Sequence, residues 1–358
     1  MRKILSFISA IIFVLSACDN KESAQTNSKP VVKIGVTVPL TGDISVIGLA
    51  NKAAIEVAAE HIKKMQTKND YQFIFEDNAY QIMKTQNAVR KLIDIDKVDA
   101  LVDVGSTSGK VVSIAAEKNK IIHLNTLSSD NEVALGKYNF VNWTSPESEA
   151  EKMIEVIKEG GYQNIAIFDI NDAGVIAITD ALEEAFSKYE IPYFVTRVNT
   201  GTKDLKAEIN KAKQKNPDFY IVTLHIPEIY VFIKQLREAG VTADVSSIEA
   251  FTFFEDLSPF EDVKYVDAAE GKGDIIEEIK RHNNSNNTFG ISNSYDNIML
   301  LVKAFESADN KENAVDELLK IKVYDGLTGR LEQDENGIFQ SEAVIKKVIN
   351  GKPVVVRE

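Results

Sequence analysis

The fold of this chain is indicated most clearly by the stretch from Val98 to Asp130, VDALVDVGSTSGKVVSIAAEKNKIIHLNTLSSD. Its short apolar run, Ala100 to Val104, is typical of a buried parallel strand. The run stops at the small polar residues Gly105 to Gly109, which precede a predicted helix from Lys110 to Asn119. Strand, polar loop and helix in this order predict an α/β protein with a parallel sheet.

A second polar loop follows the next predicted strand. That strand, Ile121 to Leu124, ends in Asn125-Thr126-Leu127-Ser128-Ser129. Because the carboxyl ends of parallel strands share one sheet edge, we expect this loop beside Gly105 to Gly109. Backbone N–H groups at a helix N-terminus, together with hydroxyls, bind small anions such as carboxylates. Ser and Thr after a strand also serve simply as helix caps, but their repetition on consecutive strands favours a ligand site.

Catalytic interpretations of the first loop fit poorly. It lacks the four-residue spacer of a phosphate-binding loop, and Val111 stands where that motif needs a Ser or Thr. A nucleophile elbow would make Thr107 the nucleophile, and a β-branched residue suits that strained turn badly. A hydrolase would also need a nearby histidine. The four histidines are scattered without an acid partner or metal-ligand spacing: His61, His123, His225 and His282. We therefore predict no enzymatic activity, no metal site and no cofactor.

The N-terminus resembles a bacterial lipoprotein signal peptide. Basic residues precede the apolar segment Ile4 to Val14, and Leu15-Ser16-Ala17-Cys18 closes it. The apolar run is too short for a comfortable membrane span, so we expect residues 1–17 to be a cleaved signal. Cys18 is the only cysteine and has no disulfide partner. By this resemblance, Cys18 becomes the lipidated first residue of the mature protein.

The residues after Cys18 bear on where the protein is held. Asp19 resembles the signal that retains a lipoprotein at the inner membrane of Gram-negative bacteria. The segment from Asn20 to Pro30 is polar and has no hydrophobic pattern. We therefore expect residues 18–30 to form a flexible tether between the lipid and the folded domain.

The mature chain would be strongly acidic. Cleavage after residue 17 removes Arg2 and Lys3 and no acidic residue, which leaves 39 basic against 54 acidic residues and a formal charge of -15. An acidic surface argues against nucleic acid as a partner. The remaining length is enough for two α/β lobes rather than one.

The alternation of strand and helix fills both halves of the chain. The first strand is predicted at Val31 to Pro39, followed by the loop Leu40 to Gly48, and the second strand at Tyr71 to Asp77. A new series begins with a strand from Asn164 to Asp169, which predicts a second lobe of the same architecture. If the first strand lies between the second and third, the Leu40 and Ser106 loops flank the switch point where open α/β sheets bind ligands.

The chain from Val32 onward resembles the type I periplasmic solute-binding proteins of the branched-chain amino acid (Leu/Ile/Val-binding) family. The likeness is spread over many short motifs. They are Ile34-Gly35-Val36 with Pro39-Leu40-Thr41-Gly42, Glu76-Asp77-Asn78, Val98-Asp99-Ala100-Leu101, Asn216-Pro217-Asp218, Gln235 to Gly240, Tyr295-Asp296 and Asp325 to Gly329. The resemblance implies two doubly wound α/β lobes with a central cleft, joined by three crossovers. Lobe one would contain residues 31–143 plus 270–323, and lobe two residues 144–269 plus 324–358.

The resemblance also implies ligand-binding residues in both lobes. The carboxylate of an amino acid would meet Ser106 or Thr107, and the loop from Thr126 to Ser128 would supply backbone and hydroxyl contacts. In lobe two, Glu249 is the best placed acidic residue to accept the ammonium group. The alternative interpretation is that Glu249 is a solvated loop residue.

Two departures from the family pattern affect the part of the site that would hold the ligand side chain. Ile47 stands before Gly48 where the family often has Tyr or Trp, and Ala173 stands before Gly174 where it often has an aromatic residue. The Phe-rich segment Ala250 to Phe254 would supply an apolar wall instead, or belong to the core. We expect an amino acid or related carboxylate as ligand, with an aliphatic amino acid as the working hypothesis.

The leading functional hypothesis is a substrate-binding lipoprotein of an ABC importer, whose lobes close over a small solute and dock on the permease. The alternative is an envelope sensor or regulatory lipoprotein that uses the same clamshell on a membrane partner without transport. The sequence does not separate the two. Both place the protein in the cell envelope, lipid-anchored, at the periplasmic face of the inner membrane in a Gram-negative cell.

Overall fold

The sheet of lobe one is built around the first strand of the chain in the computed structural model, which describes residues 29–254 and 256–357. β1 (Val31–Val38) pairs in parallel with β2 (Asp70–Asp77) on one side and β3 (Ala100–Val104) on the other. β4 (Ile122–Thr126) and β5 (Asn139–Thr144) continue the sheet in parallel beyond β3. The predicted order, with the first strand between the second and third, is confirmed.

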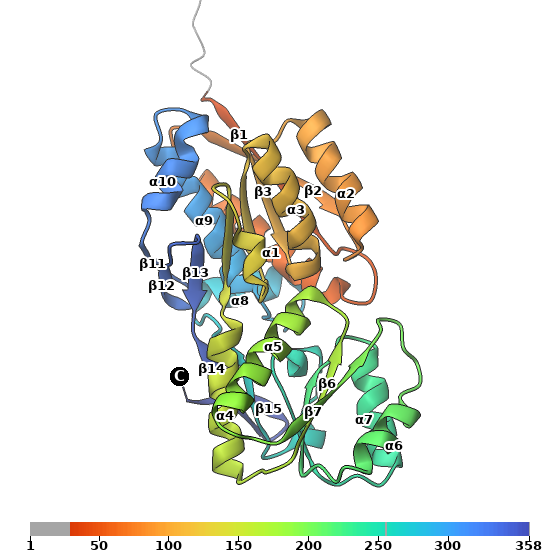
Figure 1. The fold of residues 1–358 in the computed structure, drawn as a ribbon. Coiled ribbons are helices and arrows are strands. Elements are labelled where there is room, and N and C mark those ends of the chain that lie inside the picture. Colours follow the sequence, from red (N-terminus) through yellow and green to blue (C-terminus); the bar gives the residue numbers. More distant parts are fainter. Residues whose placement is uncertain (1–28, 255, 358) are drawn as a thin grey trace, which may run out of the picture.

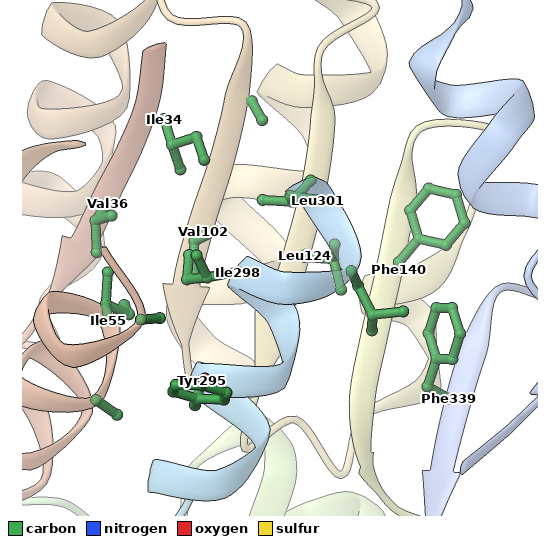
Figure 2. Packing of buried hydrophobic residues seen from close by; sticks show 14 of the residues in the cluster. Ile34, Val36, Ile55, Val102, Leu124, Phe140, Tyr295, Ile298, Leu301 and Phe339 are labelled. Atoms are coloured by element: carbon green, nitrogen blue, oxygen red, sulfur yellow. The ribbon is translucent and has the colours of Figure 1, made fainter. Parts of the chain in front are cut away.

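Both faces of this sheet are covered, which explains why its strands are continuous apolar runs. In β3, Val102 faces the core formed with α1 and α9, whereas Leu101 faces α2 and α3. Figure 2 shows Val102 and Leu124 packed against Ile298 and Leu301 of α9. The helices of lobe one are α1 (Ser45–Lys63), α2 (Ile82–Lys91), α3 (Ser106–Asn119), α8 (Asp274–Asn283), α9 (Ile291–Ser307) and α10 (Ala314–Lys320).

Lobe two repeats this architecture and lies against the first lobe end to end (Figure 1). Its parallel sheet has the order β7-β6-β8-β9, with α4 and α5 on one face and α6 and α7 on the other. The elements are α4 (Pro146–Gly160), β6 (Ile165–Ile170), α5 (Ala173–Lys188), β7 (Tyr193–Val198), α6 (Lys206–Lys213), β8 (Phe219–Thr223), α7 (Glu228–Glu238) and β9 (Asp244–Ser247).

A small antiparallel sheet completes lobe two. Its order is β10-β14-β15, formed by β10 (Lys264–Ala268), β14 (Ala343–Ile349) and β15 (Lys352–Arg357). A parallel bridge between Ile248 and Val266 links this sheet to the end of β9. Short helical turns occur at Leu92–Asp96, Asn131–Ala134, Ala250–Phe253, Ser258–Phe260 and Lys311–Asn313.

The expected lobe boundary at residue 324 is wrong. β11 (Val323–Gly326), β12 (Gly329–Gln333) and β13 (Ile338–Ser341) all extend the sheet of lobe one, because β13 pairs in parallel with β5. Ile338 and Phe339 bury their side chains in the lobe-one core. Residues 324–341 therefore belong to lobe one. The strand partner of β13 lies about two hundred residues earlier in the chain, so no local pattern could indicate this pairing.

The chain passes between the lobes three times, after β5, after β10 and after β13. This confirms the predicted two-lobed α/β fold with three crossovers. The predicted signal peptide, residues 1–17, and the lipidation site Cys18 lie outside the described residues. Among the helices of residues 29–254 and 256–357, none is long and apolar enough to cross a membrane.

Candidate functional site

A cavity lies between the two lobes, at the carboxyl edges of their parallel sheets. Its empty volume is about 630 Å³, including space open to solvent. The walls are mostly apolar with a few polar groups, as in sites that bind small molecules. Lobe one contributes Ile44, Ile47, Tyr80, Val104, Gly105, Ser106, Leu127, Ser129 and Phe289; lobe two contributes Asp172, Gly174, Val175, Ile178, Thr223, His225, Ile248, Glu249, Ala250 and Phe253.

The first turn of α3 forms one polar wall of the cavity. Gly105 follows the end of β3 with a backbone φ of 89°, and a side chain there would come within 2.6 Å of the Tyr80 ring. Glycine is therefore required for the turn that places Ser106 at the start of α3. Ser106 is buried and lines the cavity. The N-terminus of α3, where the sequence predicts carboxylate binding, thus lies at the cavity wall.

A buried polar network holds the two predicted loops together beneath this wall. The carboxylate of Asp103 lies 2.7 Å from Nε2 of His123 and accepts hydrogen bonds from Asn125 (2.7 Å) and Ser108 (2.9 Å). These side chains are all essentially inaccessible to solvent. The network joins the strand end of β3, the first turn of α3 and β4. It was not predicted, and it gives His123 a structural role inside lobe one.

The second predicted loop supports the wall more than it lines the cavity. Ser128 donates a hydrogen bond to the hydroxyl of Ser106 at 3.1 Å, so it orients that residue from behind. Thr126 lies inside lobe one, where its hydroxyl accepts a hydrogen bond from Asn297 at 2.8 Å. Neither Thr126 nor Ser128 lines the cavity. In this loop the cavity-lining residues are instead Leu127 and Ser129.

Asp172 joins the two lobes across the cavity. Its Oδ1 caps α5 by accepting from the backbone N–H of Gly174 at 3.0 Å. Its Oδ2 accepts from the hydroxyls of Thr107 (2.7 Å) and Tyr80 (3.2 Å), both in lobe one. Burial and the neighbouring Asp172 charge raise the pKa of Tyr80, which therefore stays protonated as a donor. Thr107, predicted as a carboxylate ligand, thus binds the opposite lobe.

Ala173 does not line the cavity, although its neighbours Asp172 and Gly174 do. Its backbone N–H donates to the Thr107 hydroxyl at 3.4 Å. Gly174 lies so close to lobe one that an added Cβ would be 2.5 Å from Oγ of Ser106. The start of α5 therefore closes against the start of α3. Ala173 contributes through its backbone, and its predicted influence on the ligand side chain stays a prediction.

Glu249 lines the cavity from lobe two, at a position with φ 61° just after β9. Its Oε1 accepts a hydrogen bond of 2.6 Å from the indole N–H of Trp143, at the end of β5. Burial raises the pKa of Glu249 to about 7, and the negative Asp267 contributes to this rise. A buried carboxyl group without a basic partner can accept a ligand cation. The described residues that line the cavity include no Lys or Arg.

Tyr80 and His225 reach the cavity from positions that the sequence did not indicate, beside Phe253 of the predicted Phe-rich segment. The rings of Tyr80 and His225 pack edge to face at 6.4 Å between centroids, and those of His225 and Phe253 at 5.9 Å. Tyr80 follows the end of β2, so the rule that ligands meet the carboxyl ends of strands could have found it. Ile47 lines the cavity as expected. Phe253 also lines the cavity, whereas Phe251 is buried in the lobe-two core.

The hydroxyl of Thr107 donates to Asp172, and no histidine of the described residues bonds to it. The described part of the chain contains no group of three or more His, Cys, Asp or Glu that could hold a metal ion.

Comparison with known proteins identifies the family. Residues 31–352 match the periplasmic binding protein family, so the chain belongs to it. No curated protein sequence matches significantly. The leucine-binding protein LivK from Thermotoga maritima is 22% identical with a TM-score of 0.82, over 90% of this chain and 97% of LivK.

Two further solved structures have the same fold. LivJ from Streptococcus pneumoniae, a branched-chain amino acid transporter substrate-binding protein in complex with isoleucine, is 17% identical with a TM-score of 0.80, over 92% of this chain and 100% of LivJ. An ABC transporter solute-binding protein from R. palustris in complex with 4-hydroxybenzoate is 15% identical with a TM-score of 0.80, over 92% of this chain and 96% of that protein.

These matches confirm the predicted resemblance to type I periplasmic binding proteins and the fold of the branched-chain amino acid group. The family is one of solute-binding proteins, which implies an extracytoplasmic location in the cell envelope. Because one fold holds isoleucine in one relative and 4-hydroxybenzoate in another, the fold does not select the ligand.

Proposed function

We propose that this protein is the substrate-binding component of an ABC importer and binds a small amino acid between its lobes. The observation that carries the proposal is the placement of two opposite kinds of polar group across one cavity. The first turn of α3, with Ser106, offers N–H and hydroxyl groups to a carboxylate. Glu249, on the other lobe, offers a carboxylate to an ammonium group.

The side chain of this ligand would lie against an apolar surface. Ile47 of lobe one and Val175, Ile178 and Ile248 of lobe two line the cavity, and Phe253 adds an aromatic wall. Such a surface favours an aliphatic side chain, since it offers few hydrogen-bond partners. Thr107, Thr126 and Ser128 act in this proposal by positioning the lobe-one wall, and Ala173 by placing the start of α5.

Closure follows from contacts that exist only when the lobes meet. A ligand that touches Ser106 and Glu249 at once binds the closed form more tightly than the open form, and so shifts the population towards closure. The closed form would then dock on a membrane permease. The protein itself catalyses no reaction in this proposal.

The second candidate is an envelope sensor or regulatory lipoprotein that uses the same closure without transport. It shares the cavity and differs only in the membrane partner. Deletion of the gene would abolish uptake of the bound solute if the protein serves an importer. Unchanged uptake, with altered envelope signalling, would favour the sensor instead.

The lipid anchor is also part of the proposal. Cys18 would carry the lipid, and the polar segment after it would keep the binding domain near the membrane. Substitution Cys18→Ser is expected to move the protein from the membrane fraction to the soluble envelope fraction. A variant that stays in the membrane fraction would contradict lipidation at this residue.

Ligand binding can be tested by thermal shift with L-leucine, L-isoleucine and 4-hydroxybenzoate. A ligand at 100 times its Kd adds about 2.7 kcal/mol to the free energy of unfolding, which is readily measured. We expect an aliphatic amino acid to raise the Tm and the variant Glu249→Gln to reduce that rise. If a wide panel of amino acids and carboxylates leaves the Tm of the folded protein unchanged, the proposed function is wrong.

A further inference from the structure

Two carboxyl groups lie together at the cavity: Glu149 is buried behind it, and Glu249 is half-buried in its wall. Glu149, in the first turn of α4, is 0% exposed, and apart from the neighbouring carboxyl group of Glu249 neither of its carboxyl oxygens has a hydrogen-bond partner among the described residues. Glu249 lies beside it and faces the cavity. Besides Glu149, the indole N–H of Trp143 donates a hydrogen bond to a Glu249 carboxyl oxygen. A charged carboxylate without partners is costly to bury, so this pair requires an explanation.

In the part of the chain that the structure describes, no basic side chain forms an ion pair with either group. On β10, Asp267 adds a negative charge near both carboxyl groups. Lys346, on β14, is a buried cation, but its Nζ is already bound to Asp267 at 2.8 Å and to Glu270 at 2.5 Å.

The remaining titratable neighbours add to the negative field or lie across the cavity. Glu147, in the same turn of α4, and Asp172, before α5, both repel a second negative charge at this place. His225 lines the same cavity, and its ring packs against Tyr80. Two carboxylates in such a field cannot both be ionised at low cost.

We propose that Glu149 and Glu249 together hold one proton in the ligand-free protein, and that an ammonium group bound at Glu249 expels this proton to solvent. The proposal deepens the proposed function and rests on its assignment of Glu249 as the ammonium acceptor. Glu149 is then a positioning residue, because it acts on the ligand through the charge of Glu249. In balance, the ammonium group brings one positive charge to the carboxyl pair and one proton leaves it, so the charge at the pair is conserved.

The direction of the pKa shifts agrees with this geometry. Burial raises the pKa of Glu149 well above its usual range, and repulsion from Glu249 adds to the rise. Burial likewise raises the pKa of Glu249 to about 7. Because the groups interact, the titration belongs to the pair rather than to either residue.

The shared proton would make the affinity for an amino acid depend on pH. Below about pH 7, the affinity for a ligand with an ammonium group should fall by up to about tenfold per pH unit, because a proton competes for the same site. A carboxylic acid that lacks an ammonium group, such as 4-hydroxybenzoate, cannot replace the proton. The pH dependence of the affinity would therefore distinguish amino acids from simple carboxylates.

Trp143 makes the proton directly observable without any ligand. It is the only tryptophan in the chain and donates to Glu249, so its fluorescence should change when this carboxyl group titrates. We expect the wild-type protein to show a transition near neutral pH, Glu149→Gln to shift it at least one unit lower, and Glu249→Gln to abolish it. A flat wild-type titration in folded protein, or the same transition in Glu249→Gln, would overturn the shared proton.

Proton expulsion is tested by calorimetry with L-leucine at pH 6.5 in phosphate and in imidazole, two buffers whose ionisation enthalpies differ. We expect close to one proton released per ligand in the wild type and clearly less in Glu149→Gln. Binding of L-leucine without proton release would overturn the coupling. If L-leucine does not bind at all, the proposed function and the coupling both fail for this ligand, while the fluorescence titration still decides the shared proton.

Discussion

The contact between Thr107 and Asp172 provides a direct test of how the lobes are held closed. The Thr107 hydroxyl, in lobe one, donates to Oδ2 of Asp172, in lobe two, at 2.7 Å. Substitution Thr107→Val removes this hydroxyl with little change of shape, and Thr107→Ser keeps it as a matched control. Because the bond spans the cleft, its loss should favour the open form and so weaken ligand binding.

The expected size of the effect follows from the partners of Asp172. A hydrogen bond to a charged group contributes about 1.5–3 kcal/mol, and the lower value applies because Tyr80 still donates to the same oxygen. A loss of about 1.5 kcal/mol corresponds to an affinity about tenfold weaker. Substitution Asp172→Ser should cost more, since it removes both bonds across the cleft, while a serine still caps α5.

The assay is a double-mutant cycle on the Kd for L-leucine, with dissociation rates from stopped flow. If Thr107 acts through Asp172, the double variant binds no more weakly than Asp172→Ser alone, and the loss appears mainly in a faster dissociation rate. Additive effects of the two substitutions would refute this reasoning and indicate that Thr107 contacts the ligand directly. Thr107→Ser should bind like the wild type; a loss equal to that of Thr107→Val would also refute it.

Two other predictions concern single buried positions. Burial raises the pKa of Asp296 from 3.8 to about 7. The stability that the protonated form of Asp296 contributes is therefore full below about pH 4 and is lost as the pH rises to 7. The variant Asp296→Asn can still accept the hydrogen bond from the Leu327 N–H. Relative to the wild type, its free energy of unfolding should therefore rise between pH 4 and pH 7, by at most about 4 kcal/mol in chemical unfolding. Equal gains at pH 4 and pH 7 would contradict this. The variant Gly174→Ala should leave the ligand-free protein as stable as the wild type or more stable by about 0.5–1 kcal/mol, because alanine favours the helix. The same variant should bind the ligand more weakly, since the alanine Cβ would lie 2.5 Å from Oγ of Ser106 in the closed form. Calorimetry measures the expected loss of affinity, and thermal unfolding measures the expected change in stability. Unchanged affinity would show that the lobes do not need this close approach.

Much of the fold could be predicted because its signals are local. Apolar runs such as Ala100 to Val104, each followed by a small polar loop and a helix, identify parallel strands wherever they occur. The restart of this alternation after Trp143 predicted the second lobe. The boundary at residue 324 failed for the opposite reason: β13 joins lobe one only because β5 presents an open edge there, and β5 is remote in sequence.

The candidate site was also predicted only in part, because some of its contacts follow from local sequence and others depend on distant segments. The rule that ligands meet the carboxyl ends of strands, together with the family resemblance, led to Ser106, Ile47 and Glu249, all of which line the cavity. Whether a hydroxyl in such a loop faces the cavity depends on what packs behind it. Thr126 turns to Asn297 and Thr107 to Asp172, and both partners come from distant segments.

The sequence by itself determined the class of fold, the two lobes and the loops that approach the ligand, because strand propensity, hydrophobic period and turn chemistry act over a few neighbouring residues. Only the tertiary structure decided which side chains meet. Tyr80 and Asp172 meet across the cleft, and Glu149 is buried beside Glu249, because closure of the lobes and packing of α4 bring distant segments together. The charge and protonation of the site arise from those meetings, since a carboxyl group takes its affinity for a proton from its surroundings and not from its place in the chain.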